Sequence, residues 1–318
     1  MSDGNAALAI QGGPKAVTRD LSEILAWPII TKEEEDAVLE ILRAGKMSGT
    51  EVTEQFEREF AAWHGVSFAL AHNNGTSALH AAMWACGVGA GDEVIGPSLT
   101  MWASLLPALN LRASVVFADI DLRTLCLDPA GLEKLITPRT RAIVAVHYFG
   151  YPCDMDPICA IARKHGVKVI EDVSHAHGGL YKGRLVGTLG DVGAMSIMSG
   201  KALPCGEGGI LITNDRQIYE RSVAFGHYER TGSPGRYTNA KSAITDPELQ
   251  RHAGSPIGGF KYRIHQLSSA VARVQLKHYR GRMAEIQAGM NRFWDLLDGV
   301  PGVGAHRPPR NSGSTMGG

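Results

Sequence analysis

Residues 142–172 read AIVAVHYFGYPCDMDPICAIARKHGVKVIED, and this stretch decides the fold. Its two ends, Ala142–His147 and Val167–Glu171, are short apolar runs typical of strands. Between them, Met155–His165 has the apolar spacing of a helix. Two strands that are apolar on both faces and joined by a helical crossover predict parallel pairing in a sheet covered by helices.

The same alternation continues outward from this stretch in both directions. Other apolar runs predict strands at Ser67–Ala71, Glu93–Gly96, Ser114–Ala118, Val192–Met198 and Gly209–Thr213. Further helical patterns cover Thr31–Gly45, Glu51–His64, Ser77–Cys86, Met101–Leu111, Pro129–Ile136 and Ile264–Met290. Residues 228–258 are rich in Gly, Ser and Pro and predict a long loop. We expect an α/β protein with a mostly parallel central sheet, with its chemistry at the carboxyl ends of the strands.

Composition excludes several classes of function. The 318 residues carry a formal net charge of +0, so no global charge favours nucleic acid or an anionic membrane. No apolar run approaches the roughly 20 residues of a membrane-spanning helix. The first 20 residues lack the pattern of a secretory signal, and the 5 cysteines are scattered without a CxxC pair. These features predict a cytoplasmic protein with reduced thiols.

Four segments carry groups suited to chemistry. Lys201 lies in a Gly-rich segment with small, apolar flanks, where desolvation would favour the neutral, nucleophilic amine. Asp172 follows a predicted strand, and Ser196 lies within another. Gly75-Thr76 opens a predicted helix, where free N–H groups can bind phosphate. Each has an ordinary explanation when taken singly, as a solvated lysine, a turn cap or a plain helix start.

A metal site is the competing interpretation of one of these segments. His175 and His177 form an HxH pair close to Asp172, and such a set can bind zinc in a hydrolase. Histidines that only satisfy backbone partners explain the pair equally well. Taken together, however, the lysine, the carboxylate and the helix start fit pyridoxal phosphate better than a metal, because that cofactor needs all three. We therefore expect no metal.

The sequence resembles the DegT/StrS family of sugar aminotransferases from about Trp27 to Leu276. The motifs that carry the resemblance are Asn74-Gly75-Thr76-Ser77-Ala78-Leu79, Gly91-Asp92-Glu93-Val94-Ile95, Asp154-Met155-Asp156, Glu171-Asp172-Val173-Ser174-His175-Ala176, and Lys201 with Gly206-Glu207-Gly208-Gly209. The resemblance implies the type I aminotransferase fold. It implies a large cofactor-binding domain over residues 1–250 and the start of a smaller, incomplete C-terminal domain over residues 251–318.

The resemblance also implies roles for individual residues. Lys201 would hold pyridoxal 5'-phosphate covalently and then move the proton, and Asp172 would pair with the pyridinium nitrogen. His175 would lie beside the ring, while Gly75, Thr76 and Ser196 would hold the phosphate. The family often has an aromatic residue after the Thr of its Pro-Ser-x-Thr segment, where this chain has Met101 and then Trp102. Lys261 replaces the Asn of the family's Gly-x-Asn-Tyr-Arg segment, which reaches the phosphate of the partner in a homodimer with shared active sites.

The expected reaction is a ping-pong transamination from glutamate or glutamine to a keto-sugar, by default a nucleotide-linked keto-deoxysugar. A cyclitol ketone such as an inosose is the alternative acceptor. Three other functions stay open: a sugar dehydratase of the same fold, the metal-dependent hydrolase, and a non-catalytic binding protein. Dehydratase relatives carry histidine where the cofactor lysine belongs, so Lys201 disfavours that function. Arg230, Tyr237 and Lys241 are candidates for contacting the sugar.

Overall fold

A seven-stranded sheet forms the centre of the molecule. The computed structural model describes residues 7–23, 25–232, 243–252 and 257–317. The strands are β1 (Phe68–His72), β2 (Glu93–Pro97), β3 (Ser114–Ala118), β4 (Thr140–Val146), β5 (Lys168–Asp172), β6 (Leu180–Tyr181), β7 (Arg184–Leu185), β8 (Val192–Ser196) and β9 (Gly209–Thr213). The central sheet has the order β1-β9-β8-β5-β4-β2-β3, and β6 and β7 form a separate hairpin.

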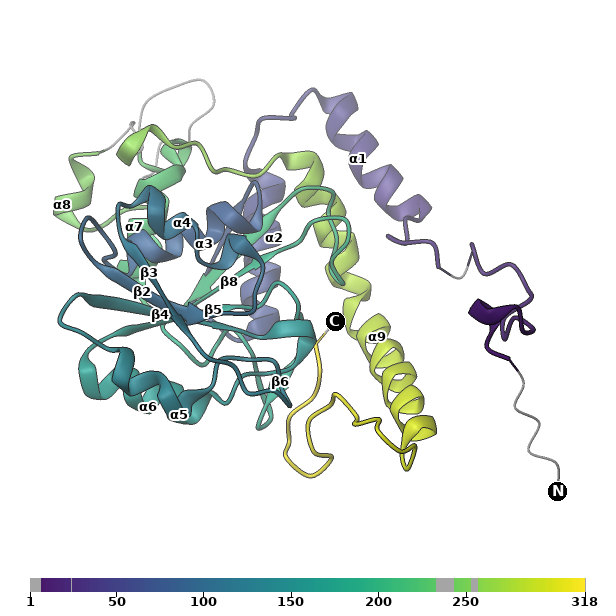
Figure 1. Cartoon of the computed structure of the whole chain (residues 1–318). Coiled ribbons are helices and arrows are strands. Elements are labelled where there is room, and N and C mark those ends of the chain that lie inside the picture. Colours follow the sequence, from purple (N-terminus) through teal and green to yellow (C-terminus); the bar gives the residue numbers. More distant parts are fainter. Residues whose placement is uncertain (1–6, 24, 233–242, 253–256, 318) are drawn as a thin grey trace.

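Helices cover both faces of this sheet (Figure 1). They are α1 (Lys32–Ala44), α2 (Glu51–His64), α3 (Gly75–Ala85), α4 (Pro107–Asn110), α5 (Pro129–Leu132), α6 (Met155–His165), α7 (Arg216–Gly226), α8 (Pro247–Gln250) and α9 (Gln266–Leu297). Figure 1 shows α3, α4 and α7 on one side and α5 and α6 on the other. Neighbouring residues of β2 face opposite sides, since Val94 belongs to the apolar cluster that contains residues of α3, and Ile95 belongs to the cluster that contains residues of α2 and α6.

The stretch from residue 142 to 172 forms the predicted unit. β4 and β5 pair in parallel, with Ala142 opposite Lys168 and Val146 opposite Asp172, and α6 connects them. β2, β3, β4, β5 and β8 are all parallel to their neighbours in this group, while β9 is antiparallel to both β1 and β8. The expected α/β fold with a mostly parallel sheet is confirmed.

Two predicted helices are shorter than expected. The helix predicted over Met101–Leu111 is divided into a 3₁₀ turn at Trp102–Ser104 and the four-residue α4. Pro107 begins α4 and has no N–H, so one continuous hydrogen-bonded helix cannot pass through it. The helix predicted over Pro129–Ile136 likewise consists of α5 and a 3₁₀ turn at Glu133–Leu135.

The region after α7 contains more structure than the sequence predicts. The described part of the predicted loop over residues 228–258 includes a 3₁₀ turn at Tyr228–Arg230 and α8. Tyr237 and Lys241 lie outside the described residues. α9 continues to Leu297, beyond the predicted end, and the following segment returns to the sheet near β6 (Figure 1). The predicted division at residue 250 stays a prediction.

No helix among the described residues is both long and apolar enough to cross a bilayer.

Candidate active site

The candidate site lies where β5 and β8 end side by side. Asp172 is the last residue of β5 and pairs in register with Ala194 of β8, two residues before Ser196. Because both strands run in the same direction, their carboxyl ends meet at one edge of the sheet. The turn with His175 follows β5, and the loop with Lys201 follows β8. The topology therefore collects groups from two loops in one place.

Asp172 is 3% exposed and is fixed by two hydrogen bonds. Its Oδ1 accepts from the N–H of Ser174 at 3.0 Å, and its Oδ2 accepts from the hydroxyl of Ser104 at 2.6 Å. Ser104 in turn lies 2.8 Å from the hydroxyl of Thr100. A carboxylate has about four acceptor positions, so Asp172 retains capacity for one more donor.

The neighbouring carboxylate, Glu171, has a structural task. It is fully buried and accepts from the N–H groups of Gly187, Leu189 and Gly190, each at 2.7 Å. His147 Nε2 lies 3.0 Å from Glu171 Oε2, the oxygen that also accepts from Gly187. Because successive strand residues face opposite sides of the sheet, Glu171 fixes the strand end that carries Asp172 and does not itself face the site.

Lys201 is half-buried in the loop after β8. Burial lowers the pKa of its amine, and the negative charge of Asp172 opposes that shift. The two groups therefore interact electrostatically although they are 29 residues apart in sequence (201 minus 172). A lowered pKa increases the fraction of the neutral, nucleophilic amine near neutral pH.

His175 interacts with the same pair of charges. Burial lowers the pKa of its ring, the positive charge of Lys201 lowers it further, and Asp172 opposes both effects. Its ring centroid lies 5.3 Å from that of Tyr148 and 6.1 Å from that of Phe149. Its Nδ1 is buried without a hydrogen-bond partner among the described residues. A buried nitrogen of this kind is available to a ligand.

The start of α3 lies against the end of β8. A Cβ added to Gly75 would lie 2.6 Å from the Cβ of Ser196 and 2.9 Å from its backbone nitrogen, so only glycine fits there. The side chain of Asn74 caps the helix by accepting from the N–H of Ser77. The N–H groups of Gly75 and Thr76 lie in the first turn, where an α-helix leaves N–H groups without helical partners.

The hydroxyls around this helix start are not equivalent. The hydroxyl of Ser77 donates to Asn73 Oδ1 at 2.6 Å and is used within the turn. The hydroxyl oxygen of Ser196 accepts from the N–H of Met198 at 3.3 Å, and its proton remains available. Thr76 is half-buried. An anion at this helix start would therefore meet backbone N–H groups with the hydroxyls of Thr76 and Ser196 nearby.

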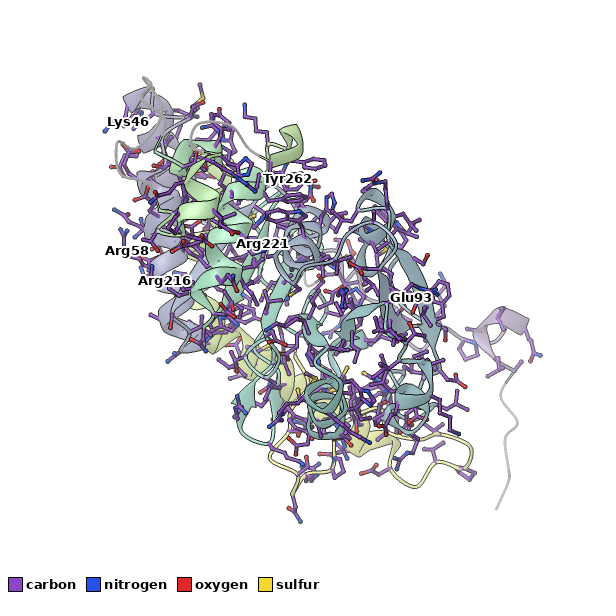
Figure 2. The ribbon with its side chains drawn as sticks, turned by 90° about the vertical axis from the view of Figure 1, so that its left-hand side faces the viewer. Lys46, Arg58, Glu93, Arg216, Arg221 and Tyr262 are labelled. Atoms are coloured by element: carbon purple, nitrogen blue, oxygen red, sulfur yellow. The ribbon has the colours of Figure 1, made fainter. Side chains whose placement is uncertain are left out.

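Two further residues, Arg221 and Tyr262, form hydrogen bonds to α3 (Figure 2). Arg221 of α7 donates from Nε and Nη2 to the last carbonyls of α3, each at 3.0 Å. The hydroxyl of Tyr262 lies 2.7 Å from His80 Nδ1, and its carbonyl accepts from the N–H of Asn73 at 2.7 Å. The helix start is thus held in place before any ligand binds.

Three other candidate residues have exposed side chains. Met101 and Trp102 are 50% and 56% exposed, so covering of the cofactor ring by either side chain stays a prediction. Lys261 is exposed and lines a separate hollow of about 440 Å³ together with Asn73, Glu207 and Arg263. Its contact with a partner's phosphate likewise stays a prediction.

Two earlier candidates have structural roles instead. Arg230, proposed as a sugar contact in a polar loop, is buried, and its guanidinium lies 2.5 Å from Glu57. His177 is buried with Nε2 2.9 Å from the carbonyl of Ser196. Among the described residues, no group of three His, Cys, Asp or Glu side chains is placed to hold a metal. The hydrolase therefore lacks a ligand set in this part of the chain.

The residues present fit pyridoxal phosphate. The group needs an amine of lowered pKa, a carboxylate for its ring nitrogen and donors for its phosphate. Lys201, Asp172 and the start of α3 provide these, and the buried Nδ1 of His175 remains without a protein partner among the described residues. Sequence reasoning missed Ser104, which holds Asp172 from the segment after β2. Its only signal was its place at the carboxyl end of a predicted parallel strand.

Fold and site together define the class of this protein as an aminotransferase of the α/β type. Its structure is similar to that of an aminotransferase from Psychrobacter cryohalolentis, with 35% identity, a TM-score of 0.75, and 86% of this chain and 68% of that one covered. S. venezuelae DesV, solved with a ketimine intermediate, shares 33% identity with a TM-score of 0.76, over 89% of this chain and 71% of that one. Within this class, the chain belongs to the DegT/DnrJ/EryC1/StrS aminotransferase family, which matches residues 28–316.

Relatives of known name are similar over much of the chain. The spore coat polysaccharide biosynthesis protein SpsC of Bacillus subtilis is 38% identical over 87% of this chain and 69% of its own length. GDP-perosamine synthase of Caulobacter vibrioides is 40% identical over 83% of this chain and 67% of its own length. The L-glutamine:2-deoxy-scyllo-inosose aminotransferase of Streptoalloteichus tenebrarius is 42% identical over 67% of this chain. This chain spans about half (51%) of that relative's length.

Proposed function

We propose that the protein transfers an amino group from glutamate or glutamine to the ketone of a sugar, using pyridoxal phosphate held by Lys201. One observation carries the proposal: a lysine whose pKa is lowered by burial interacts with a buried carboxylate at the carboxyl end of a parallel sheet. When bound, pyridoxal phosphate supplies the electron sink and the carrier for the amino group.

The protein's own groups have distinct tasks in this proposal. Lys201 Nζ would hold the cofactor, and its free amine would be the group that moves the proton from the donor's α-carbon. Asp172 keeps the ring nitrogen protonated, because a carboxylate beside a pyridinium favours the charged form. Ser104 fixes Asp172 through its hydroxyl. The start of α3 orients the phosphate through the N–H groups of Gly75 and Thr76.

The names of the relatives support two classes of acceptor. GDP-perosamine synthase points to a nucleotide-linked sugar, and the inosose aminotransferases point to a cyclitol ketone and to L-glutamine as donor. Identities of 40% and 42% do not separate these acceptors. We propose the nucleotide-linked keto-deoxysugar first, because DesI, solved in the presence of its TDP-sugar product, matches 97% of this chain with a TM-score of 0.79. The cyclitol ketone remains the alternative, because the L-glutamine:scyllo-inosose aminotransferase of Streptomyces griseus is 39% identical over 92% of this chain.

The test is made in two half-reactions. The protein is loaded with cofactor and given L-glutamate or L-glutamine, and conversion to the pyridoxamine form is followed by absorbance. The aminated protein is then mixed with nucleotide-linked keto-sugars and, separately, with inososes. Recovery of the original spectrum with one class identifies the acceptor. Failure of both donors to change the spectrum would contradict the function, and bound cofactor without this change would indicate a binding protein.

We further propose a homodimer in which Lys261 serves the partner's site. Exposed apolar side chains in the segment after β2, including Met101, Trp102 and Leu109, support an interface there. Inactive Lys201→Ala and weakened Lys261→Ala proteins would be mixed after partial unfolding. If the sites are shared, hybrids contain one intact site and activity reappears on mixing. If each chain is self-sufficient, mixing restores nothing.

A further inference from the structure

Trp27 holds the backbone of Lys201 from 174 residues away. Its indole N–H donates to the carbonyl of Lys201 at 3.1 Å. The N–H of Lys201 donates to the carbonyl of Met198 at 2.8 Å. Both peptide groups of the lysine are therefore tied, although the loop contains glycine at positions 200 and 206 and would otherwise be permissive.

Trp27 is itself held by α9. The guanidinium carbon of Arg282 lies 5.6 Å from the centroid of the indole, within the range of a cation–π contact. Arg282 also donates from Nη1 to the side-chain oxygen of Gln275, which lies about two helical turns earlier on the same face of α9. The indole is thus fixed between the lysine loop and the long helix that leads to the C-terminal segment.

Gln275 connects this contact to the start of α1. It is fully buried, and its Nε2 donates to the carbonyl of Ile29 at 2.9 Å and to Glu34 Oε1 at 2.6 Å. Glu34 also accepts from the N–H of Thr31 in the capping box. A continuous set of hydrogen bonds and one cation–π contact therefore runs from the cap of α1 through α9 to the carbonyl of Lys201. Within this set, Gln275 and Glu34 are buried, and buried polar groups that are paired in this way favour a single arrangement.

We propose that Trp27 is a positioning residue for Lys201, and that the contact with Arg282 transmits the position of α9 to the reactive amine. The proposal rests on the proposed function, because it assumes that Lys201 is the reactive group. The peptide planes on either side of a Cα are rigid, so fixing both the N–H and the carbonyl of Lys201 restricts its φ and ψ, and with them the direction of its side chain. Proton transfer by Nζ depends steeply on that direction, since a displacement of about 1 Å can lower a rate by about a hundredfold.

The exposure of the indole supports this role over a simple packing role. Trp27 is 39% exposed, so its ring contributes less to the core than a buried tryptophan does. Its directed contact is the hydrogen bond through Nε1. Removing the donor while keeping an aromatic ring should therefore affect the lysine more than the fold.

The experiment compares Trp27→Phe with Trp294→Phe in cofactor-loaded protein. Trp294 lies on α9 beside Phe293, so its replacement controls for the loss of an indole elsewhere in the chain. The half-reaction is measured at increasing L-glutamine or L-glutamate to separate its limiting rate from the donor affinity. Hydrogen–deuterium exchange of the peptide covering residues 198–206 reports the loop directly, whatever the activity.

We expect Trp27→Phe to lower the limiting rate about tenfold, to change donor affinity little, and to speed amide exchange in residues 198–206. Trp294→Phe should match the wild type in all three. Arg282→Gln should change the same quantities in the same direction but less, and adding it to Trp27→Phe should have little further effect, because both act through one contact.

Several outcomes would overturn the inference. A Trp27→Phe protein with wild-type limiting rate and wild-type exchange would show that the hydrogen bond does not position the lysine. Additive effects of the Trp27 and Arg282 changes would show that α9 is not coupled through the indole. Failure of the proposed function is distinguishable, because the wild-type protein itself would then show no half-reaction, while the exchange comparison would still report on the loop.

Discussion

Replacing Gly75 with alanine tests the phosphate seat at the start of α3. The added Cβ would lie 2.6 Å from the Cβ of Ser196, 2.8 Å from its Cα and 2.9 Å from its nitrogen. Two of these three atoms are backbone, so a side-chain rotation cannot relieve the contact. The helix start and the end of β8 must move apart, and overpacking of this kind costs typically about 1–3 kcal/mol.

The same movement should weaken cofactor binding. One phosphate can bind the N–H groups of Gly75 and Thr76 together with the hydroxyl of Ser196 only while the start of α3 lies against the end of β8. If the displacement costs the complex about 1.4–2.8 kcal/mol, the dissociation constant for pyridoxal phosphate rises about tenfold to a hundredfold. The assay is a titration of cofactor-free protein followed by absorbance, together with urea unfolding of the same samples.

Gly289→Ala is the matched control. Gly289 lies within α9, and no atom lies within 4 Å of the Cβ that alanine would add. Alanine in a helix interior should stabilise the protein by roughly 0.5–1 kcal/mol, with unchanged cofactor affinity. Wild-type affinity in Gly75→Ala would refute the reasoning, and so would an equal loss of affinity in Gly289→Ala.

Three further predictions concern the two strand ends. Asp172→Asn should retain the cofactor but lower the rate of the half-reaction about a hundredfold, measured by stopped-flow absorbance, because the amide carries no charge to hold the ring nitrogen protonated. Labelling of the Lys201 amine should rise with pH through a midpoint below that of an ordinary lysine, because burial lowers the pKa of Lys201. Asp172→Asn should move this midpoint lower still, because the carboxylate of Asp172 raises the pKa of Lys201. Glu171→Gln should lower the free energy of unfolding by about 2 kcal/mol in urea, because an amide nitrogen would face the N–H of Gly187 or the two N–H groups of Leu189 and Gly190. The first prediction would be contradicted by a wild-type rate in Asp172→Asn, and the second by a labelling midpoint that rises in that protein. The third would be contradicted by an unchanged free energy of unfolding in Glu171→Gln.

Local pattern sufficed to predict the parallel strands. A strand such as β4 is apolar on both faces because helices cover both faces. The consecutive residues from Ala142 to Val146 are therefore all apolar and buried. The reversed direction of β9 could not be predicted in this way. Its residues are equally apolar, and the direction depends on how the short loop after β8 turns back.

The site was predictable only where its groups lie next to strand ends or helix starts. Asp172, Gly75 and Lys201 have such places in the sequence, whereas Ser104 and Trp27 contact them from 68 and 174 residues away. Such contacts depend on the packing of whole elements. Arg230 shows the opposite case, since its polar surroundings in sequence suggested exposure, but the fold pairs it with Glu57 in the interior.

Lys201 must be the residue that carries the cofactor if the protein is to act as proposed. The most direct measurement is to load the protein with pyridoxal phosphate, reduce it with borohydride, digest it and locate the added mass by mass spectrometry. The mass is predicted on Lys201 in the wild type and should disappear in Lys201→Ala together with turnover. A label on another lysine, or turnover that survives in Lys201→Ala, would contradict the account.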